Sequence, residues 1–499
     1  RYELPSPMTE RFDRSVRGFD FDAASPIEAA ARAAYAANPI PQVPADAFRV
    51  RGGLTYPNVN GQPRNLWDTT QSNYMPRFGF AYSITPMTVF RGGYGIYFEP
   101  IGVPNSDVIQ TGFTQTTQLV PTLDNGQTFV ASLANPFPGG LTLPTGAAGG
   151  LRTNLGQAVS FFNRNLHNPY MQRWQFALQR SLPAGSVLEV SYVGNRGVRQ
   201  RISRNINALP NSYLSTSPLR DQATINLLNA QVRNPFFPLL PGTGLSGNTV
   251  ARSQLLLPYP QFTAVNMDTN QGYSWYHSMQ ARYEKRFGAG FMSTVSWTWS
   301  KLMEARSYLN AGDPLPEKVI SDQDRTQRIA ITAIYEMPFG KGRRWATKGV
   351  ASKVVGGWQV SGIYQGQSGP PLGFGNAIFR GNLADINIPN GQRTVDRWFN
   401  IDAGFDRNTA TQLASNVQTL STRFTGVRGD GTNNFDIAFI KNTTIGERFT
   451  VQFRAEGINA MNHPQFLPPN TTPTSSAFGQ VTQEWSSPRT IQFALKILF

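Results

Sequence analysis

The sequence predicts an all-β chain that forms an antiparallel transmembrane β-barrel of the outer-membrane type, and three observations carry this prediction. Short segments alternate apolar and polar residues, as in the final stretch Arg489–Phe499. Short and long connections alternate between these segments, and aromatic residues gather near their ends. One apolar face, one polar face and this rhythm of connections are typical of strands with lipid on one side and water on the other.

Composition excludes several kinds of site among the 499 residues. The chain has no Cys, which excludes disulfides, iron–sulfur clusters and thiolate zinc sites. The net charge is +15, but only 15% of residues are charged and the basic ones are scattered, unlike a solvated basic arm. No apolar run reaches about 18 residues, so no transmembrane helix is predicted, and the opening residues lack the apolar core of a signal peptide.

The predicted elements are mostly strands. A strand remnant is expected at Arg1–Glu3, and a helix within Ser25–Pro39, where a Ser cap precedes an Ala-rich run that ends at Pro. The remaining expected strands are Arg77–Ile84, Thr88–Glu99, Met171–Ser181, Ser186–Gly194, Trp275–Phe287, Gly290–Ser300, Asp324–Pro338, Gly356–Gly366, Asn434–Thr444, Arg448–Asn459 and Pro488–Phe499.

The connections between these strands alternate in length. The short ones are Thr85–Met87, Leu182–Gly185, Gly288–Gly290, Gly446–Glu447 and the longer, basic Phe339–Gly356. The long ones are Pro100–Tyr170, Asn195–Ser274, Lys301–Gln323, Gln367–Asn433 and Ala460–Ser487. Because structureless loops of this length are uncommon in compact soluble domains, the alternation favours short periplasmic turns and long surface loops.

Within the strands, polar side chains share the face opposite the large apolar ones. For any single segment, an ordinary half-buried strand remains the alternative. Amide, hydroxyl and charged side chains suit a water-filled interior better than the dry core of a small soluble barrel. The candidate lumen-facing residues are Gln175, Gln179, Glu189, Thr450, Gln452, Arg454, Gln492 and Lys496.

Aromatic residues lie near both ends of the predicted strands. Those near the long connections are Trp174, Trp275, Trp297, Trp299 and Trp485. Those near the opposite ends are Phe287, Phe291, Phe339, Trp358, Phe449 and Phe499. Two rings of amphipathic aromatic side chains at the two interfaces are typical of outer-membrane barrels, although aromatic residues are common in any strand.

An ordered series of segments covers essentially the whole chain and resembles a known family. It includes "NPYMQRWQFALQRSLPAGSVLEVSYVGNRGVRQ", "SDQDRTQRIAITAIYEMPFGKGRRW" and "EGINAMNHPQFLPPN". The series is similar to the barrel of TonB-dependent receptor-like outer-membrane proteins of the Oar-like type, which are common in Acidobacteria. The resemblance implies a barrel of about 22 strands around a plug. It also implies energy from the TonB complex and assembly through the C-terminal Phe499.

The expected domain organisation follows from the resemblance and from the number of predicted strands. Residues 1–499 are expected to be the C-terminal portion of the barrel, with about 12 strands, as a fragment of a longer chain. The plug, the N-terminal β-sandwich and the signal peptide are not expected within these residues. Contact with the TonB complex is therefore expected only through the missing N-terminal part, and outer-membrane lipid is the expected surrounding.

Other motifs give no catalytic, cofactor or metal site. The stretch Phe90–Phe98 partly matches an RNA-binding signature, but no RRM frame surrounds it, so no nucleic acid is expected as a partner. The acidic run around Asp430–Asp436 lacks the final Glu of an EF-hand loop. The three His residues lie far apart and fit no catalytic or metal spacing, so the chain is not expected to be an enzyme.

Three functions remain open at this point. The first is an outer-membrane TonB-dependent receptor or transporter that takes up a saccharide, peptide or protein ligand through its surface loops and a polar lumen. The second is a non-transporting adhesin or structural protein that displays its loops. The third is a soluble basic nucleic-acid binder, which the strand pattern disfavours.

Overall fold

The computed structural model describes residues 1–499 except 103–106, 118, 120, 123–126, 142 and 447. The strands are β1 (Tyr2–Glu3), β2 (Gly18–Ala24), β3 (Arg51–Thr55), β4 (Asn73–Tyr74), β5 (Arg77–Thr85), β6 (Thr88–Phe98), β7 (Ala158–Phe162), β8 (Tyr170–Leu182), β9 (Ser186–Asn205), β10 (Gln231–Arg233), β11 (Thr249–Ala251), β12 (Ala264–Gly288), β13 (Phe291–Ala305), β14 (Val319–Ile320), β15 (Gln327–Glu336), β16 (Trp358–Gln367), β17 (Pro371–Leu372), β18 (Phe424–Arg428), β19 (Thr432–Ile445), β20 (Phe449–Ile458) and β21 (Thr490–Leu498). The α-helices are α1 (Glu28–Ala36), α2 (Gln222–Asn229), α3 (Arg252–Leu255) and α4 (Gly349–Val355).

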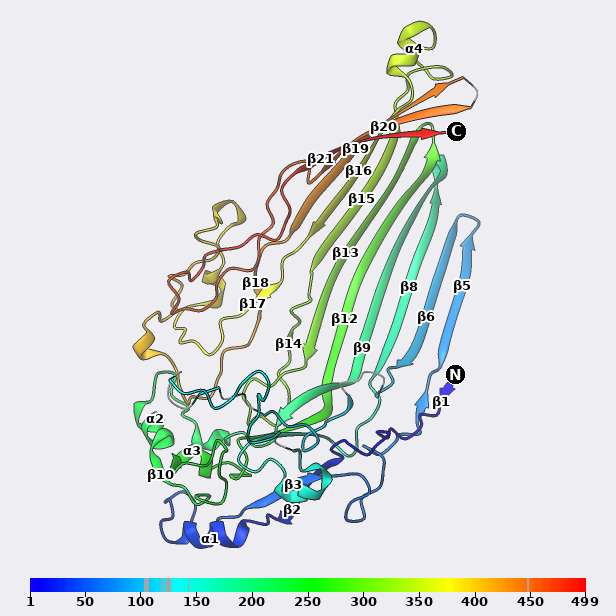
Figure 1. Ribbon diagram of the computed structural model, residues 1–499. Coiled ribbons are helices and arrows are strands. Elements are labelled where there is room, and N and C mark those ends of the chain that lie inside the picture. The colour runs from blue at the N-terminus through cyan, green and yellow to red at the C-terminus, as the bar shows by residue number, and fades with distance from the viewer. Residues whose placement is uncertain (103–106, 118, 120, 123–126, 142, 447) are drawn as a thin grey trace.

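One large antiparallel sheet organises the molecule (Figure 1). Its strand order is β5-β6-β8-β9-β12-β13-β15-β16-β19-β20-β21, while β7 pairs in parallel with β12 and β14 pairs with β13. Every one of the eleven predicted strands is present, which confirms the predicted all-β antiparallel sheet. The path ends at β5 and β21, and these two strands are its edges.

Two strands are much longer than the alternation predicts. Strand β9 continues to Asn205 and β12 begins at Ala264, whereas the prediction ended one at Gly194 and began the other at Trp275. The pairing of β9 with β12 has register shifts around Gly272, and Arg199 has a φ of 58°. These irregularities break the two-residue period, which is the reason the extension carries no sequence signal.

The predicted strand remnant at the N-terminus forms a strand, but this strand is not part of the main sheet. Strand β1 pairs with β4 in a separate two-stranded sheet, in which Tyr2 lies opposite Tyr74 and Glu3 opposite Asn73. Strand β4 is followed after two residues by β5, so β1 lies beside the start of the first edge strand. The main sheet therefore has eleven strands along its path rather than twelve.

The short connections gather at one end of the sheet, together with α4 (Figure 1). Ala289 and Gly290 join β12 to β13 in a two-residue turn in which both residues have positive φ, 51° and 82°. Pro183–Gly185 joins β8 to β9. In the predicted turn Gly446–Glu447, Glu447 lies outside the described residues, and β19 and β20 flank this position.

The helix predicted within Ser25–Pro39 forms as α1 in the segment that precedes the main sheet. Ala31 and Tyr35, four residues apart, are buried on one face, and the Tyr35 ring stacks on Phe48 with 3.9 Å between ring centroids. The side chain of Ser25 makes no capping hydrogen bond. The backbone carbonyl of Ser25 instead accepts a hydrogen bond from the Glu28 backbone N–H at 2.8 Å.

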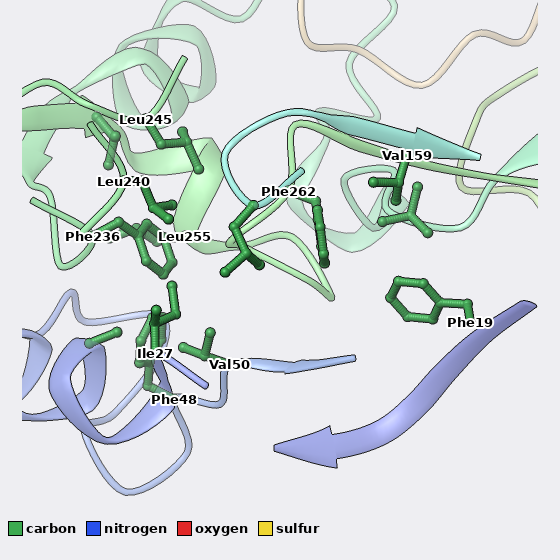
Figure 2. Close-up of a cluster of buried hydrophobic side chains, with 14 of the residues drawn as sticks. Phe19, Ile27, Phe48, Val50, Val159, Phe236, Leu240, Leu245, Leu255 and Phe262 are labelled. Atoms are coloured by element: carbon green, nitrogen blue, oxygen red, sulfur yellow. The ribbon is translucent and has the colours of Figure 1, made fainter. Parts of the chain in front are cut away.

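At the other end of the sheet the long connections fold together. A buried apolar cluster joins residues before β5, residues between β6 and β8, and residues between β9 and β12 (Figure 2). Phe19, Phe48, Phe161, Phe236 and Phe262 are among its buried rings. We call these three segments, 16–56, 155–161 and 228–265, the cap. A second cluster lies in the connections that flank β17 and β18 and the one after β20.

Candidate ligand-binding site at the loop end of the sheet

The predicted polar residues share one face of the sheet. Gln179 lies directly opposite Glu189, and Gln452 lies opposite Lys496. Directly paired residues point to the same side of a sheet, and alternate residues of one strand do too. The remaining candidates lie on the same face. Gln175 lies on the same strand face as Gln179, and Thr450 and Arg454 lie on the same strand face as Gln452. Gln492 lies opposite Glu456, which is also on this face.

The pairing also joins the two groups of candidates across the sheet. Glu189 is opposite Arg282, and this row continues through Ser296, Ala330, Gln365 and Asn434 on successive strands. Asn434 shares its strand face with Asn442, which is opposite Gln452 and accepts a hydrogen bond from it at 2.9 Å. The eight candidates therefore lie on one side. That this side faces a lumen stays a prediction.

The opposite face carries an apolar surface. Phe176, Tyr192, Met279 and Trp299 form one row across four adjacent strands. All four side chains are exposed in the structure, Trp299 by 54%. Glycines in neighbouring rows make room for large rings, since a Cβ on Gly194 would lie 2.4 Å from the Trp174 indole. Large apolar side chains exposed in a continuous belt match the lipid-facing surface of a membrane sheet.

A cleft of about 730 Å³ opens where the polar face meets the long connections. Its walls come from the residues after β6, the far end of β9, β12 and the residue after β13. The charged side chains in the lining are Glu99, Asp107, Arg201, Asp268 and Arg306. The volume of this open cleft lies in the range of ligand pockets, and its lining is unusually rich in charged groups.

Arg201 binds two carboxylates at the centre of this cleft. Its guanidinium pairs with Asp107 and, at 2.9 Å, with Asp268. It also lies 5.4 Å from the centre of the Phe162 ring. The Asp107 side chain is only 1% exposed and also accepts from the Gly102 backbone N–H at 2.6 Å. The two carboxylates and one guanidinium leave a net negative charge in the wall.

Glu99 and Arg306 complete the charged lining. Within the described part of the chain, neither side chain has a hydrogen-bond or ion-pair partner. Because both are exposed groups of opposite sign, they are free to bind complementary charges on a ligand. The sequence prediction missed this whole set. Glu99 and Asp107 follow β6, Arg201 and Asp268 lie in the extended parts of β9 and β12, and Arg306 follows β13. Only the cluster of Arg residues after Gly194 was visible in the sequence.

Buried ion pairs fasten the neighbouring connections to each other. Arg423 binds Glu304 and Arg428 binds Asp324, each at 2.6 Å, and the Asp324 side chain is fully buried. Glu317 accepts from the Ser421 hydroxyl at 2.6 Å and the Thr422 hydroxyl at 2.7 Å. Glu304, Glu317 and Asp324 thus hold the end of β13 and the connection after it to the segment around β18.

A family model described as "Outer membrane beta barrel domain" matches residues 1–492. The chain belongs to this family. Members of the outer membrane beta barrel family reside in the cell outer membrane, which confirms the predicted location and sheet architecture. A search of curated proteins finds no match.

None of the helices in the described residues is long and apolar enough to span a bilayer. Among those residues, no group of three or more His, Asp or Glu is placed to hold a metal ion.

Several solved outer-membrane structures are similar to this family member at low identity. The outer membrane transporter YddB from Escherichia coli aligns with a TM-score of 0.43 at 11% identity, over 85% of this chain and 40% of that one. The FrpB iron transporter from Neisseria meningitidis aligns with a TM-score of 0.37 at 9% identity, over 85% of this chain and 39% of that one. The BauA receptor from Acinetobacter baumannii aligns with a TM-score of 0.38 at 10% identity, over 90% of this chain and 38% of that one. The chain spans about two-fifths of their length.

Proposed function

We propose that the chain is the barrel part of a TonB-dependent type of receptor, which takes up a ligand across the outer membrane. The observation that carries the proposal is the charged cleft at the junction of the polar face and the folded long connections. A rigid scaffold with a built pocket on its loops is the usual arrangement of a binding protein. In this proposal, residues 1–499 are the C-terminal part of the barrel.

The route of the ligand follows from the two faces of the sheet. The ligand first contacts Glu99 and Arg306 in the cleft, which bind groups of opposite charge. It then passes along the polar face, where Gln175, Gln179 and Glu189 exchange hydrogen bonds with it in place of water. The same face continues to Thr450, Gln452, Arg454, Gln492 and Lys496. A saccharide or a peptide fits this lining, and the TonB complex would supply the energy.

A non-transporting surface protein is the second candidate, and the cap favours it. The cap has its own buried core, as a displayed domain would have. Uptake by intact cells separates the two functions. With fluorophore-labelled oligosaccharides and peptides as probes, a transporter accumulates one class in the periplasm, and a protonophore abolishes this accumulation. Surface binding that the protonophore does not change would favour display.

Two substitutions connect uptake to the cleft. Glu99→Gln and Arg306→Gln are expected to reduce uptake of the accumulated probe, because each removes a charge that faces the cavity. Arg233→Gln, on β10 outside the lining, is the charge-matched control and should leave uptake unchanged. Equal loss in all three variants would contradict the assignment of the cleft as the binding site.

The facing of the strands has a direct chemical test in outer membranes. The chain has no Cys, so single substitutions give unique labelling sites. A water-soluble thiol reagent is expected to react with Arg454→Cys on the polar face and not with Phe453→Cys on the apolar face. Reaction of the Phe453→Cys variant alone would reverse the proposed facing.

A further inference from the structure

The connection between β15 and β16, residues 337–357, differs from the other turns at the short-turn end of the sheet. It is the longest of them and contains α4, which extends beyond the strands in Figure 1. The sequence identifies Phe339–Gly356 as a long, basic connection among the short ones. The structure adds where the segment lies and which side chains it exposes.

This segment is strongly basic. It contains Lys341, Arg343, Arg344, Lys348 and Lys353 and no Asp or Glu. Arg343 pairs with Glu336 at the end of β15, while the Arg344 guanidinium lies 5.2 Å from the centre of the Trp345 ring. In the part of the chain that the structure describes, the other cations have no carboxylate partner. The segment thus presents a concentrated positive charge.

The same segment exposes apolar side chains beside these cations. Trp345 is 51% exposed, Val350 78% and Val354 60%. Within α4 itself no residue is buried. A helical turn that leaves two Val side chains and a Trp uncovered, with Lys and Arg around them, has the composition of a segment that lies in a membrane interface.

Hydrogen bonds attach α4 to the apolar face of the sheet. Trp358 Nε1 donates to the Val354 carbonyl at 3.2 Å, and Lys441 Nζ donates to the Lys353 carbonyl at 2.8 Å and to the Gly356 carbonyl. Trp358 and Lys441 are paired across β16 and β19, and their row continues through Phe453 and Leu495. The helix is therefore held where the lipid-facing belt reaches its short-turn edge.

We propose that residues 337–357 form an interfacial anchor that binds the anionic phospholipid headgroups of the leaflet at the short-turn end. The Val350, Val354 and Trp345 side chains enter the headgroup boundary, and Lys341, Arg344, Lys348 and Lys353 bind phosphates. Charge complementarity and continuity with the apolar face support this occupant. The proposal depends on the outer-membrane location and is independent of ligand uptake.

A single fluorescent label tests the anchor in the complete protein. Val354→Cys carries the label, and the protein is placed in nanodiscs of phosphatidylcholine with or without phosphatidylglycerol. Shallow spin-labelled lipid is expected to quench the label about two-fold or more strongly when phosphatidylglycerol is present. Replacing Lys341, Arg344, Lys348 and Lys353 together by Gln should remove this dependence on phosphatidylglycerol.

The control label is Met87→Cys, on the β5–β6 turn, where Met87 is exposed and no basic cluster is adjacent. Its quenching should not depend on phosphatidylglycerol. Equal, weak quenching of the Val354 label in both discs would overturn the proposal in favour of a solvated turn. Protection of the label in whole envelopes but not in discs would show that a protein covers the segment, which also overturns it.

Discussion

At the residue scale, Arg201 is the side chain on which the cleft wall depends. It is the partner of the buried Asp107 and of Asp268. Arg201→Met should lower the free energy of unfolding by about 2 kcal/mol, because it leaves a buried carboxylate without its counter-charge. Urea titration of the detergent-solubilised protein, followed by Trp fluorescence, measures this change.

The matched control removes an exposed ion pair in the regular part of β12. Arg282 binds Glu284 at 3.0 Å, with side chains 59% and 40% exposed. Arg282→Met should cost less than about 0.5 kcal/mol, since solvent screens such a pair. If both variants lose the same stability, the Arg201 contacts are no stronger than surface pairs.

Asp221 gives a pH dependence at the start of α2. Its carboxylate accepts from the Thr224 hydroxyl at 2.7 Å, the Thr224 backbone N–H at 3.1 Å and the Ser215 hydroxyl at 2.8 Å. These hydrogen bonds lower the pKa of Asp221 from 3.8 to about 2. Because the folded pKa is the lower one, the stabilisation is complete above about pH 4 and is lost as the pH falls through 2.

Hydrogen exchange of the α2 amides, corrected for the intrinsic rate at each pH, checks this expectation. Protection should fall between pH 4 and pH 2 in the natural sequence. In Asp221→Asn it should be lower at pH 4 and nearly flat over this range, because the amide cannot titrate. A steep fall in the Asn variant would assign the pH dependence to another group.

At the element scale, the turn between β12 and β13 contains a correctable strain. Ala289 has a φ of 51°, in the left-handed region that disfavours a side chain. Ala289→Gly should raise the free energy of unfolding by about 1 kcal/mol, because Gly enters this region freely. Chemical denaturation measures the gain. In the regular part of β12, Ala281→Gly should instead lower the free energy of unfolding.

The strands themselves were predictable, and the site was not. Trp174, Phe176 and Leu178 repeat with period 2, so local sequence already specifies an amphipathic strand. The contact of Arg201 with Asp107 joins residues 94 positions apart, the first in the irregular part of β9 and the second in the connection after β6, where the sequence shows no two-residue period. The rings of Phe19, Phe236 and Phe262 likewise meet only in the folded cap. Tertiary packing, which no local pattern encodes, brings these groups together.

At the scale of the whole molecule, the directions of the edge strands constrain barrel closure. Ten successive antiparallel pairings lead from β5 to β21, so these two strands run in the same direction. A barrel that is antiparallel throughout therefore needs an odd number of further strands between them. The unpaired N–H and C=O groups of both edges require such partners in lipid.

Disulfide trapping in outer membranes tests this expectation. Tyr82→Cys on β5, combined in turn with Cys in place of Ile491, Phe493, Leu495 or Ile497 on β21, should not form a disulfide. Phe453→Cys with Leu495→Cys is the positive control, because these residues are directly opposite each other. A trapped pair between β5 and β21 would mean that the two edges meet directly in a parallel pairing.

The shared core of the cap has a consequence for recognition by other molecules. Segments 16–56, 155–161 and 228–265 are far apart in sequence but contribute side chains to one cluster (Figure 2). An antibody that contacts a surface formed by two or more of these segments therefore recognises a discontinuous epitope. Binding should disappear when the protein is unfolded, and short peptides copied from any one segment should not compete for it.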